Sequence, residues 1–356
     1  MMEKSFTIVE APSVLGLFPK GVETLPDALL AAGLAERLGA RRAGRVEPPA
    51  YDHERDPETL MLNPRGIADY AVALADAVGA VVDRGEFPVV LGGDCSILLG
   101  NLLALGRRGR YGLHFLDGHA DFYQPEAEPN GEAASMELAL ATGRGPAVVT
   151  AIEGRRPLVR DEDVVVFGRR DAAAADAYGS QRIEDTAIAM TDLAAVRAVG
   201  AEAAAASAVT RLAKAELDGI WIHLDADVVD DAVMPAVDYR MPDGLSWDEL
   251  AAVLRAGVNA GAVGINVTIN PKLDGDGSIA RAFVEALARG LLAMTLAGQW
   301  PLVFRDRCGS RSVDQRSAKA RRTPSAANMP ANDRCSHRIT PGEEITRSRA
   351  SAAKVP

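Results

Sequence analysis

Cysteine is scarce in this chain of 356 residues, which has three, at positions 95, 308 and 335. Three cysteines cannot form the disulfide framework of a small secreted protein, and such sparse use suits a reducing compartment. Long hydrophobic runs are also missing: no stretch of 18 apolar residues occurs, which argues against a membrane span. The N-terminus has an acidic residue, Glu3, where a signal peptide needs a basic segment before an apolar core. We therefore expect a cytoplasmic protein that does not enter membranes.

Positive charge is in short supply as well. The chain carries 39 Lys and Arg against 49 Asp and Glu, a formal net charge of −10, which argues against nonspecific nucleic-acid binding by the body of the protein. The charge is unevenly distributed. Residues 305–356 hold 12 Lys and Arg against 5 Asp and Glu, a net of +7, so residues 1–304 carry −17.

The C-terminal stretch 305–356 is rich in Arg, Ser, Ala and Pro and has almost no apolar periodicity. This composition predicts a disordered basic tail, either an interaction arm or an extension without a fold. No convincing linker interrupts residues 1–304. We therefore predict one globular domain over 1–304, followed by the tail.

Apolar strand-like runs alternate with longer helical patterns through residues 1–304. The predicted strands are 6–10, 88–91, 111–116, 163–167, 187–191, 220–224 and 263–269, and the predicted helices are 64–84, 97–107, 192–216, 246–260 and 278–297. Ser246 and Glu249 form a capping-box pattern at the start of one helix. Near-continuous apolar strands that alternate with helices predict an α/β fold, a three-layer α/β/α sandwich around a mostly parallel sheet.

Two acidic clusters follow apolar runs that are interpreted as buried strands. The first contains Asp117, His119 and Asp121, and the second contains Asp225 and Asp227. Alternate residues of an extended strand point the same way, so each cluster is expected to project its side chains to one side. Functional groups gather at the carboxyl ends of strands in open α/β sheets, and the loop 92–96 follows a third strand there.

Carboxylates crowded in this way repel one another strongly unless a cation lies among them. Carboxylate oxygens with one imidazole favour Mn²⁺, Mg²⁺ or Zn²⁺, and five ligands exceed what one tetrahedral site uses. Two divalent ions would lower the pKa of a bridging water and supply hydroxide near neutral pH, which is hydrolytic chemistry. An isolated Asp-x-Asp pair usually caps a turn, but two clusters and a third strand-end loop favour the metal site.

Three ordered motifs resemble the arginase/agmatinase/formiminoglutamase (ureohydrolase) family. They are Gly92-Gly93-Asp94-x-Ser96, Asp117-x-His119-x-Asp121 and Asp225-x-Asp227-x-x-Asp230, and further likenesses extend over roughly residues 6–298. The resemblance implies an arginase-like fold, a binuclear manganese site, and homo-oligomers. It also implies that position 95 with Asp117, Asp121 and Asp225 holds one ion. Asp117, His119, Asp225 and Asp227 would hold the other.

This sequence departs from the family pattern at three positions. The first metal ligand is normally histidine and here is Cys95, so the site could take Zn²⁺ or Fe²⁺, or the thiol could stay neutral beside an essentially mononuclear site. Ala134 stands where arginases carry a proton-relaying histidine, and Glu132, Glu126 or Glu128 are the candidate replacements as acid/base. Thr268 stands where a carboxylate normally binds the guanidinium group. We therefore do not expect arginine itself to be the substrate.

The leading hypothesis is a metal-dependent hydrolase that cleaves a C–N bond of an amidino, guanidino or amide-type small molecule. Asp121 is predicted to orient the attacking hydroxide, with Glu132 as the acid/base. The alternative is a catalytically weak homologue that acts as a metal-binding regulatory or oligomer subunit. His114 and His223 are interpreted as packed strand histidines whose phase differs from that of the ligands.

Overall fold

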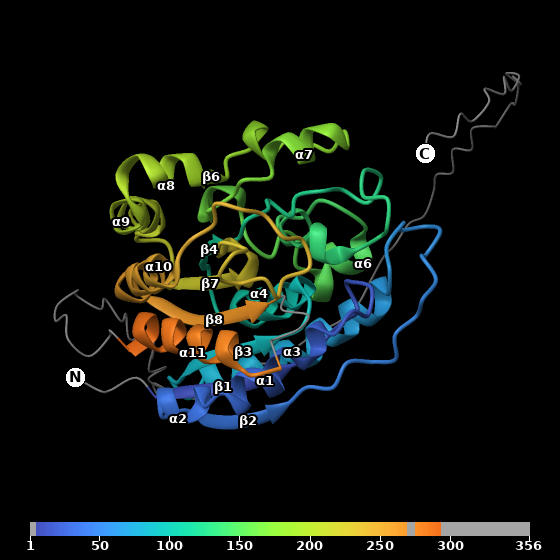
Figure 1. The fold of residues 1–356 in the computed structure, drawn as a ribbon. Helices are drawn as coiled ribbons and strands as arrows, with labels where there is room; N and C mark the ends of the chain where they lie inside the picture. The colour runs from blue at the N-terminus through green and yellow to red at the C-terminus, as the bar shows by residue number, and fades with distance from the viewer. Residues whose placement is uncertain (1–4, 269–274, 293–356) are drawn as a thin grey trace, which may run out of the picture. The chain divides into compact units, whose positions relative to one another are not determined.

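The computed structural model describes residues 5–268 and 275–292 (Figure 1). Within these residues eight strands form one sheet in the order β2-β1-β3-β8-β7-β4-β5-β6, and each neighbouring pair is parallel. The strands are β1 (Phe6–Ala11), β2 (Arg41–Arg45), β3 (Phe87–Gly92), β4 (Gly112–Leu116), β5 (Val164–Phe167), β6 (Ala189–Thr191), β7 (Ile220–Asp225) and β8 (Ala262–Thr268). The predicted parallel sheet is confirmed.

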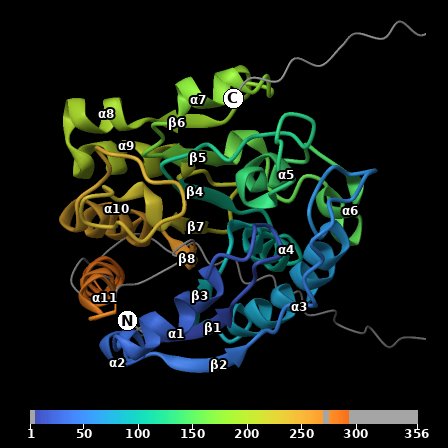
Figure 2. The same cartoon turned by 45° about the vertical axis from the view of Figure 1, so that its right-hand side comes forward.

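Helices cover both faces of this sheet (Figures 1 and 2). The α-helices are α1 (Leu25–Ala31), α2 (Leu34–Leu38), α3 (Pro64–Val82), α4 (Leu98–Gly106), α5 (Glu137–Ala141), α6 (Ala147–Thr150), α7 (Ala172–Ala177), α8 (Leu193–Val199), α9 (Ala201–Leu212), α10 (Trp247–Asn259) and α11 (Ser278–Leu291). Short 3₁₀ turns include η2 (Cys95–Ile97), η3 (Ala133–Ser135) and η7 (Ala226–Val228). The predicted three-layer sandwich is therefore confirmed.

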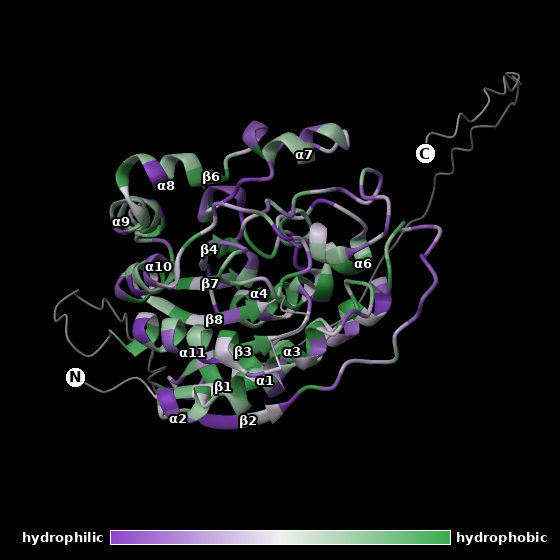
Figure 3. Ribbon diagram, in the orientation of Figure 1, coloured by the Kyte–Doolittle hydropathy of each residue, from purple (hydrophilic) through white to green (hydrophobic). Residues whose placement is uncertain are grey.

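Two hydrophobic cores lie on opposite faces of the sheet. One contains residues of α1, α2, α8, α9, α10 and α11, and the other contains residues of α3, α4, α5 and α6. The central strands contribute to both cores, because alternate residues of a strand face opposite sides. Figure 3 shows these strands as largely hydrophobic and the edge strand β2 as hydrophilic.

The structure differs from the sequence prediction at one strand and one helix. Strand β2 was not predicted, because its sequence Arg-Arg-Ala-Gly-Arg has no apolar pattern and all five residues are exposed. It pairs with β1 at the sheet edge, where Arg42 and Arg45 form ion pairs with the buried Glu10. The single helix predicted over 192–216 is two, α8 and α9, because Gly200 between them has φ 86° and ψ 149°, which is not helical.

The start of α10 is determined by its local sequence. The predicted capping box of α10 is present, since Glu249 N donates to Ser246 Oγ and Ser246 N donates to Glu249 Oε2.

Among the described residues, no single helix has the length and apolar character to cross a membrane. Helices α8 and α9, which are separated by a sharp bend, have that length and character only when they are taken together. The predicted tail 305–356 lies outside the described residues.

The order of the central strands places the predicted motifs next to one another. Strands β3, β8, β7 and β4 are consecutive neighbours, and Asp225 pairs in register with Thr268. Because the strands are parallel, their carboxyl ends share one edge of the sheet. The motifs that begin at residues 92, 117 and 225 therefore meet at that edge.

Candidate metal centre

The turn after β3 is built by a close approach of two backbone segments. A Cβ atom on Gly93 would lie 1.8 Å from the carbonyl oxygen of Ser13, so only glycine fits. Asp94 N donates to that carbonyl at 2.9 Å, and the Asp94 carboxylate accepts from Ser13 Oγ and Ser96 N, each at 2.9 Å. Asp94 thus caps η2 and fixes the position of Cys95.

The loop after β4 does not continue the strand. Strand β4 ends at Leu116, and Asp121 has φ 43°, in the left-handed region. The expectation that Asp117, His119 and Asp121 alternate along an extended strand is therefore wrong. They are placed by the turn instead: His119 N donates to Asp117 Oδ1 at 2.6 Å, and Leu138 N donates to the Asp121 carbonyl at 3.1 Å.

The loops after β4 and β7 are joined by the second acidic cluster. Asp227 N donates to Asp225 Oδ1 at 2.7 Å, which closes the turn η7. Asp227 Oδ1 accepts from Gly118 N at 2.9 Å, and Asp227 Oδ2 lies 2.7 Å from His119 Nδ1. The two clusters, about a hundred residues apart in the chain, are therefore in direct contact.

Three groups of side chains among the described residues have the spacing of metal ligands, and two of them contain Asp117. Asp117, His119 and Asp227 offer ligand atoms within 4.8 Å of one another, and so do Asp117, Asp121 and Glu137. Asp117 belongs to both groups, as expected of a bridging ligand. Glu137, the first residue of α5, was missed by the sequence reasoning, because only the fold carries that short helix to the acidic clusters.

Cys95 lies at the edge of this site. Its Sγ is fully buried, 3.0 Å from Asp225 Oδ2 and 3.1 Å from Thr268 Oγ1. It forms a group within 4.8 Å with Glu137 and His223, and it packs in one small apolar cluster with Ala134. The structure thus brings Cys95 to the carboxylates, as expected.

The expectation that His223 differs in phase from the ligands is wrong. His223 precedes Asp225 by two residues in β7 and so points to the same side of the sheet, not the opposite one. Its Nε2 lies 3.8 Å from Glu137 Oε1 and 4.0 Å from Asp117 Oδ2. His114, by contrast, is a buried packing residue with its ring edge-on to Phe167, as predicted.

Burial and mutual repulsion dominate the electrostatics of the cluster. Burial, and then the neighbouring Asp227, raises the pKa of Asp117 to about 7. Burial and adjacent carboxylates also raise the pKa of Asp121, Asp225 and Glu137 well above the usual range. Burial alone would lower the pKa of His119, but the Asp227 and Asp117 carboxylates outweigh it and raise that pKa. These carboxylates are therefore ionised at a cost that a cation among them would relieve.

The donor set fits divalent cations. Several buried atoms have no hydrogen-bond partner among the described residues, namely Asp117 Oδ2, both Glu137 carboxylate oxygens and His223 Nε2. Unpaired buried polar atoms are costly and uncommon. Carboxylate oxygens with an imidazole suit Mn²⁺, Mg²⁺ or Zn²⁺, and two overlapping groups allow two ions that share Asp117.

Glu132, the candidate acid/base, is buried and accepts three hydrogen bonds. Its carboxylate accepts from Phe18 N at 3.2 Å, Asn130 Nδ2 at 3.3 Å and Tyr239 Oη at 3.3 Å. The Tyr239 ring lies edge-on to His119, with centroids 6.1 Å apart. Glu132 therefore holds Tyr239 in contact with His119.

The two other loop carboxylates considered as acid/base candidates lie in different surroundings. Glu128 accepts from the backbone of Gly131 and Glu132, which shapes the loop. Glu126 is exposed to solvent. Neither belongs to a group with the spacing of metal ligands among the described residues.

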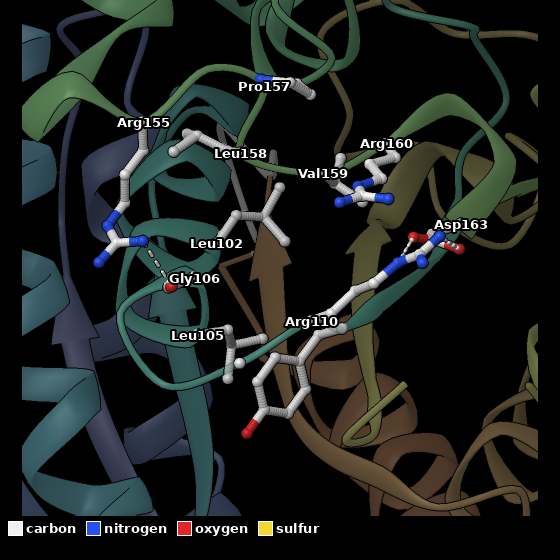
Figure 4. Close-up of a pocket in the computed structure, with 12 residues that line it drawn as sticks. Leu102, Leu105, Gly106, Arg110, Arg155, Pro157, Leu158, Val159, Arg160 and Asp163 are labelled. Carbon is white, nitrogen blue, oxygen red and sulfur yellow. Dashed lines mark hydrogen bonds and ion pairs between the residues drawn. The ribbon is translucent and has the colours of Figure 1, made fainter. Parts of the chain in front are cut away.

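A surface cavity of about 230 Å³ lies elsewhere (Figure 4). Its lining includes Tyr111 and Arg110, just before β4, and Asp163, just before β5. Arg110 pairs with Asp163 at 2.6 Å, and Arg155 donates to the Gly106 carbonyl at 2.8 Å. The cavity is thus at the amino ends of these strands, away from the edge that carries the acidic groups.

A parallel sheet between helix layers, with carboxylates and an imidazole gathered at the carboxyl ends of its central strands, defines a metallohydrolase-like α/β protein. A sequence model of the arginase family matches residues 4–293, and the chain belongs to that family. Arginase from Bacillus caldovelox is 31% identical over 284 residues, which cover 76% of this chain and 92% of that protein.

Solved structures agree with this assignment. The structure of Bacillus caldovelox arginase matches with a TM-score of 0.73 at 28% identity, covering 83% of this chain and all of that one. The fold is shared more widely: formimidoylglutamase from Bacillus subtilis matches with a TM-score of 0.64 at 18% identity, over 83% of this chain and 89% of that one.

Proposed function

We propose that this arginase-family hydrolase uses two divalent ions, manganese foremost, to cleave a C–N bond of an amidino, guanidino or amide-type small molecule. The observation that carries the proposal is the contact between the two acidic clusters, in which Asp227 meets both His119 and the backbone of Gly118. A protein with no use for cations would not gather so many buried carboxylates, since each costs free energy unless it is paired.

The chain's own residues have distinct roles in this proposal. Asp117 would bridge the ions, His119 and Asp227 would hold one of them, and Asp225 would contribute from the end of β7. When bound, the ions would lower the pKa of a water molecule and stabilise negative charge that develops on the substrate. The Asp121 carboxylate, held by the left-handed turn, would orient the attacking water and take up its proton.

Arginine remains a substrate to be tested. The Bacillus caldovelox relative described above is named arginase, and this gives no support to the expectation that arginine is excluded. Thr268, at the position of the family's guanidinium-binding carboxylate, is buried and occupied by contacts with Cys95 Sγ and the Leu224 carbonyl. We propose a substrate whose cationic group, if it has one, does not depend on residue 268 for a counter-charge.

The test is turnover of a substrate panel by metal-stripped full-length protein before and after Mn²⁺ is added. The panel includes arginine, agmatine, other guanidino acids, formimino compounds and simple amides, with urea, ammonia and amine release as readouts. Asp227→Asn removes a central charge from the site. Asp231→Asn is the matched control, because Asp231 pairs only with Arg240 among the ionic partners found in the described residues.

We expect manganese-dependent turnover of at least one compound, abolished in Asp227→Asn and retained in Asp231→Asn. Metal binding without turnover of any compound would instead support the catalytically weak regulatory subunit. Absence of metal binding would contradict both. A cytoplasmic location and assembly into homo-oligomers stay predictions, which fractionation and light scattering can test.

A further inference from the structure

Glu137 is the most unusual carboxylate in the described part of the chain. Its side chain is fully buried at the start of α5, and neither of its oxygens accepts a hydrogen bond from an N–H or hydroxyl donor among the described residues. Its contact with Asp121 is a hydrogen bond only when one of the two acids carries a proton. An unpaired buried carboxylate is strongly destabilising. Its position therefore needs a cause, and a bound cation would supply one.

The surroundings of Glu137 are those of a ligand. One of its oxygens lies within 4.8 Å of carboxylate oxygens of both Asp117 and Asp121, and one lies within 4.8 Å of Cys95 Sγ and a ring nitrogen of His223. A divalent ion with ligands at about 2.0–2.3 Å fits between donors with this separation. Glu137 thus faces the ion position that Asp117 and Asp121 define.

A buried chain of hydrogen bonds from Trp221 through Asn266 to His223 determines which His223 ring nitrogen carries the proton. Trp221 Nε1, which can only donate, lies 2.7 Å from Asn266 Oδ1, so the Asn266 amide nitrogen faces His223 Nδ1 at 2.8 Å. His223 Nδ1 must then accept, which leaves the ring proton on Nε2. That nitrogen lies 3.8 Å from Glu137 Oε1 and 4.0 Å from Asp117 Oδ2, so it adds a donor close to both carboxylates but makes no direct hydrogen bond to either.

Cys95 is less suited to the ion than Glu137. Its thiol already lies within hydrogen-bonding distance of Asp225 Oδ2 and Thr268 Oγ1, and soft sulfur is a poor ligand for Mn²⁺, which prefers oxygen. We propose that Glu137, and not Cys95, completes the ligand set of the ion held by Asp117 and Asp121. This inference rests on the proposed function and departs from the ligand set that the family resemblance implies.

The test compares metal binding by four full-length proteins after stripping and reloading with Mn²⁺: wild type, Glu137→Gln, Cys95→Ala and Glu10→Gln. Glu10 is a buried control carboxylate, paired with Arg42 and Arg45 at the far edge of the sheet. Manganese per chain and the dissociation constants are measured by elemental analysis and titration. Paramagnetic resonance distinguishes a coupled pair of manganese ions from single ions.

We expect Glu137→Gln to lose one of two ions, or to bind the weaker ion at least about tenfold less tightly, the scale known for perturbed metal sites. The resonance signal of a coupled pair should change to that of a single ion. Cys95→Ala and Glu10→Gln should keep both ions. Unchanged manganese binding in Glu137→Gln, or loss of an ion in Cys95→Ala, would overturn the inference.

Two further measurements cover the case in which Glu137→Gln does not fold. Glu137→Asp keeps the charge but withdraws the oxygens, so it should weaken one ion selectively. In the wild type loaded with Co²⁺, a thiolate ligand would produce sulfur-to-cobalt charge-transfer absorption; we expect none, and a strong band would contradict the proposal. If the wild type binds two ions and turns over substrate while Glu137→Gln binds normally, only this inference fails. If the wild type binds no metal, the proposed function fails too.

Discussion

Removing divalent ions and raising the pH should destabilise this protein, because its acidic cluster must then ionise without a cation. Burial and Asp227 raise the pKa of Asp117 from the ordinary 3.8 to about 7 in the metal-free fold. When a folded-state pKa lies above the unfolded one, the stabilisation is fully present below the unfolded pKa and is lost as the pH rises through the folded pKa. The loss should therefore occur between about pH 4 and pH 7.

The size of the effect follows from the same group. A difference of one between folded and unfolded pKa is worth about 1.4 kcal/mol, so Asp117 sets a scale of about 4 kcal/mol for the loss. Asp117→Asn keeps the shape of the protonated acid but cannot ionise. We expect the metal-free variant to match the metal-free wild type near pH 4 and to exceed it by a few kcal/mol at pH 8.

Urea unfolding of both proteins at the two pH values, with chelator and then with Mn²⁺, measures this difference. A ligand at a hundred times its dissociation constant stabilises the folded state by about 2.7 kcal/mol, so Mn²⁺ should recover more than half of the wild type's lost stability at pH 8 and leave the variant nearly unchanged. Identical pH dependence of the two metal-free proteins would refute the reasoning.

Three other substitutions, the first with a matched control, test packing and hydrogen bonds by urea unfolding. Gly93→Ala should unfold the protein or cost several kcal/mol, because its Cβ would meet a backbone carbonyl at 1.8 Å, whereas Gly275→Ala, whose Cβ would have no atom of the described residues within 4 Å, should be nearly neutral. Ser246→Ala should cost about 1 kcal/mol through loss of the capping box; no change would show that the cap is dispensable. Asn266→Leu should cost about 1–3 kcal/mol, since Trp221 Nε1 would lose its acceptor, and equal stability would mean that another acceptor replaces it.

Much of the sheet was predictable because its central strands are buried on both faces and read as continuous apolar runs. The edge strand β2 was not predicted because it is exposed and consists largely of arginine. Its position depends on the ion pairs with Glu10. The break between α8 and α9 depends on one residue, Gly200, whose conformation a helical periodicity does not reveal.

The candidate site was predictable in part for a related reason. Residues that follow neighbouring parallel strands must meet at one edge, so the contact between His119 and Asp227 could be foreseen. Glu137 could not, since it belongs to no strand end and reaches the cluster only through the packing of a short helix. The placement of Asp121 likewise depends on a left-handed turn, which no alternation of residues predicts.

Anomalous diffraction from crystals grown with Mn²⁺ tests the central claim most directly. The account predicts two manganese peaks about 3.5–4 Å apart, one beside Asp117, His119 and Asp227 and the other beside Asp117 and Asp121. A map with no manganese among these residues, at an ion concentration that saturates binding in solution, would contradict it.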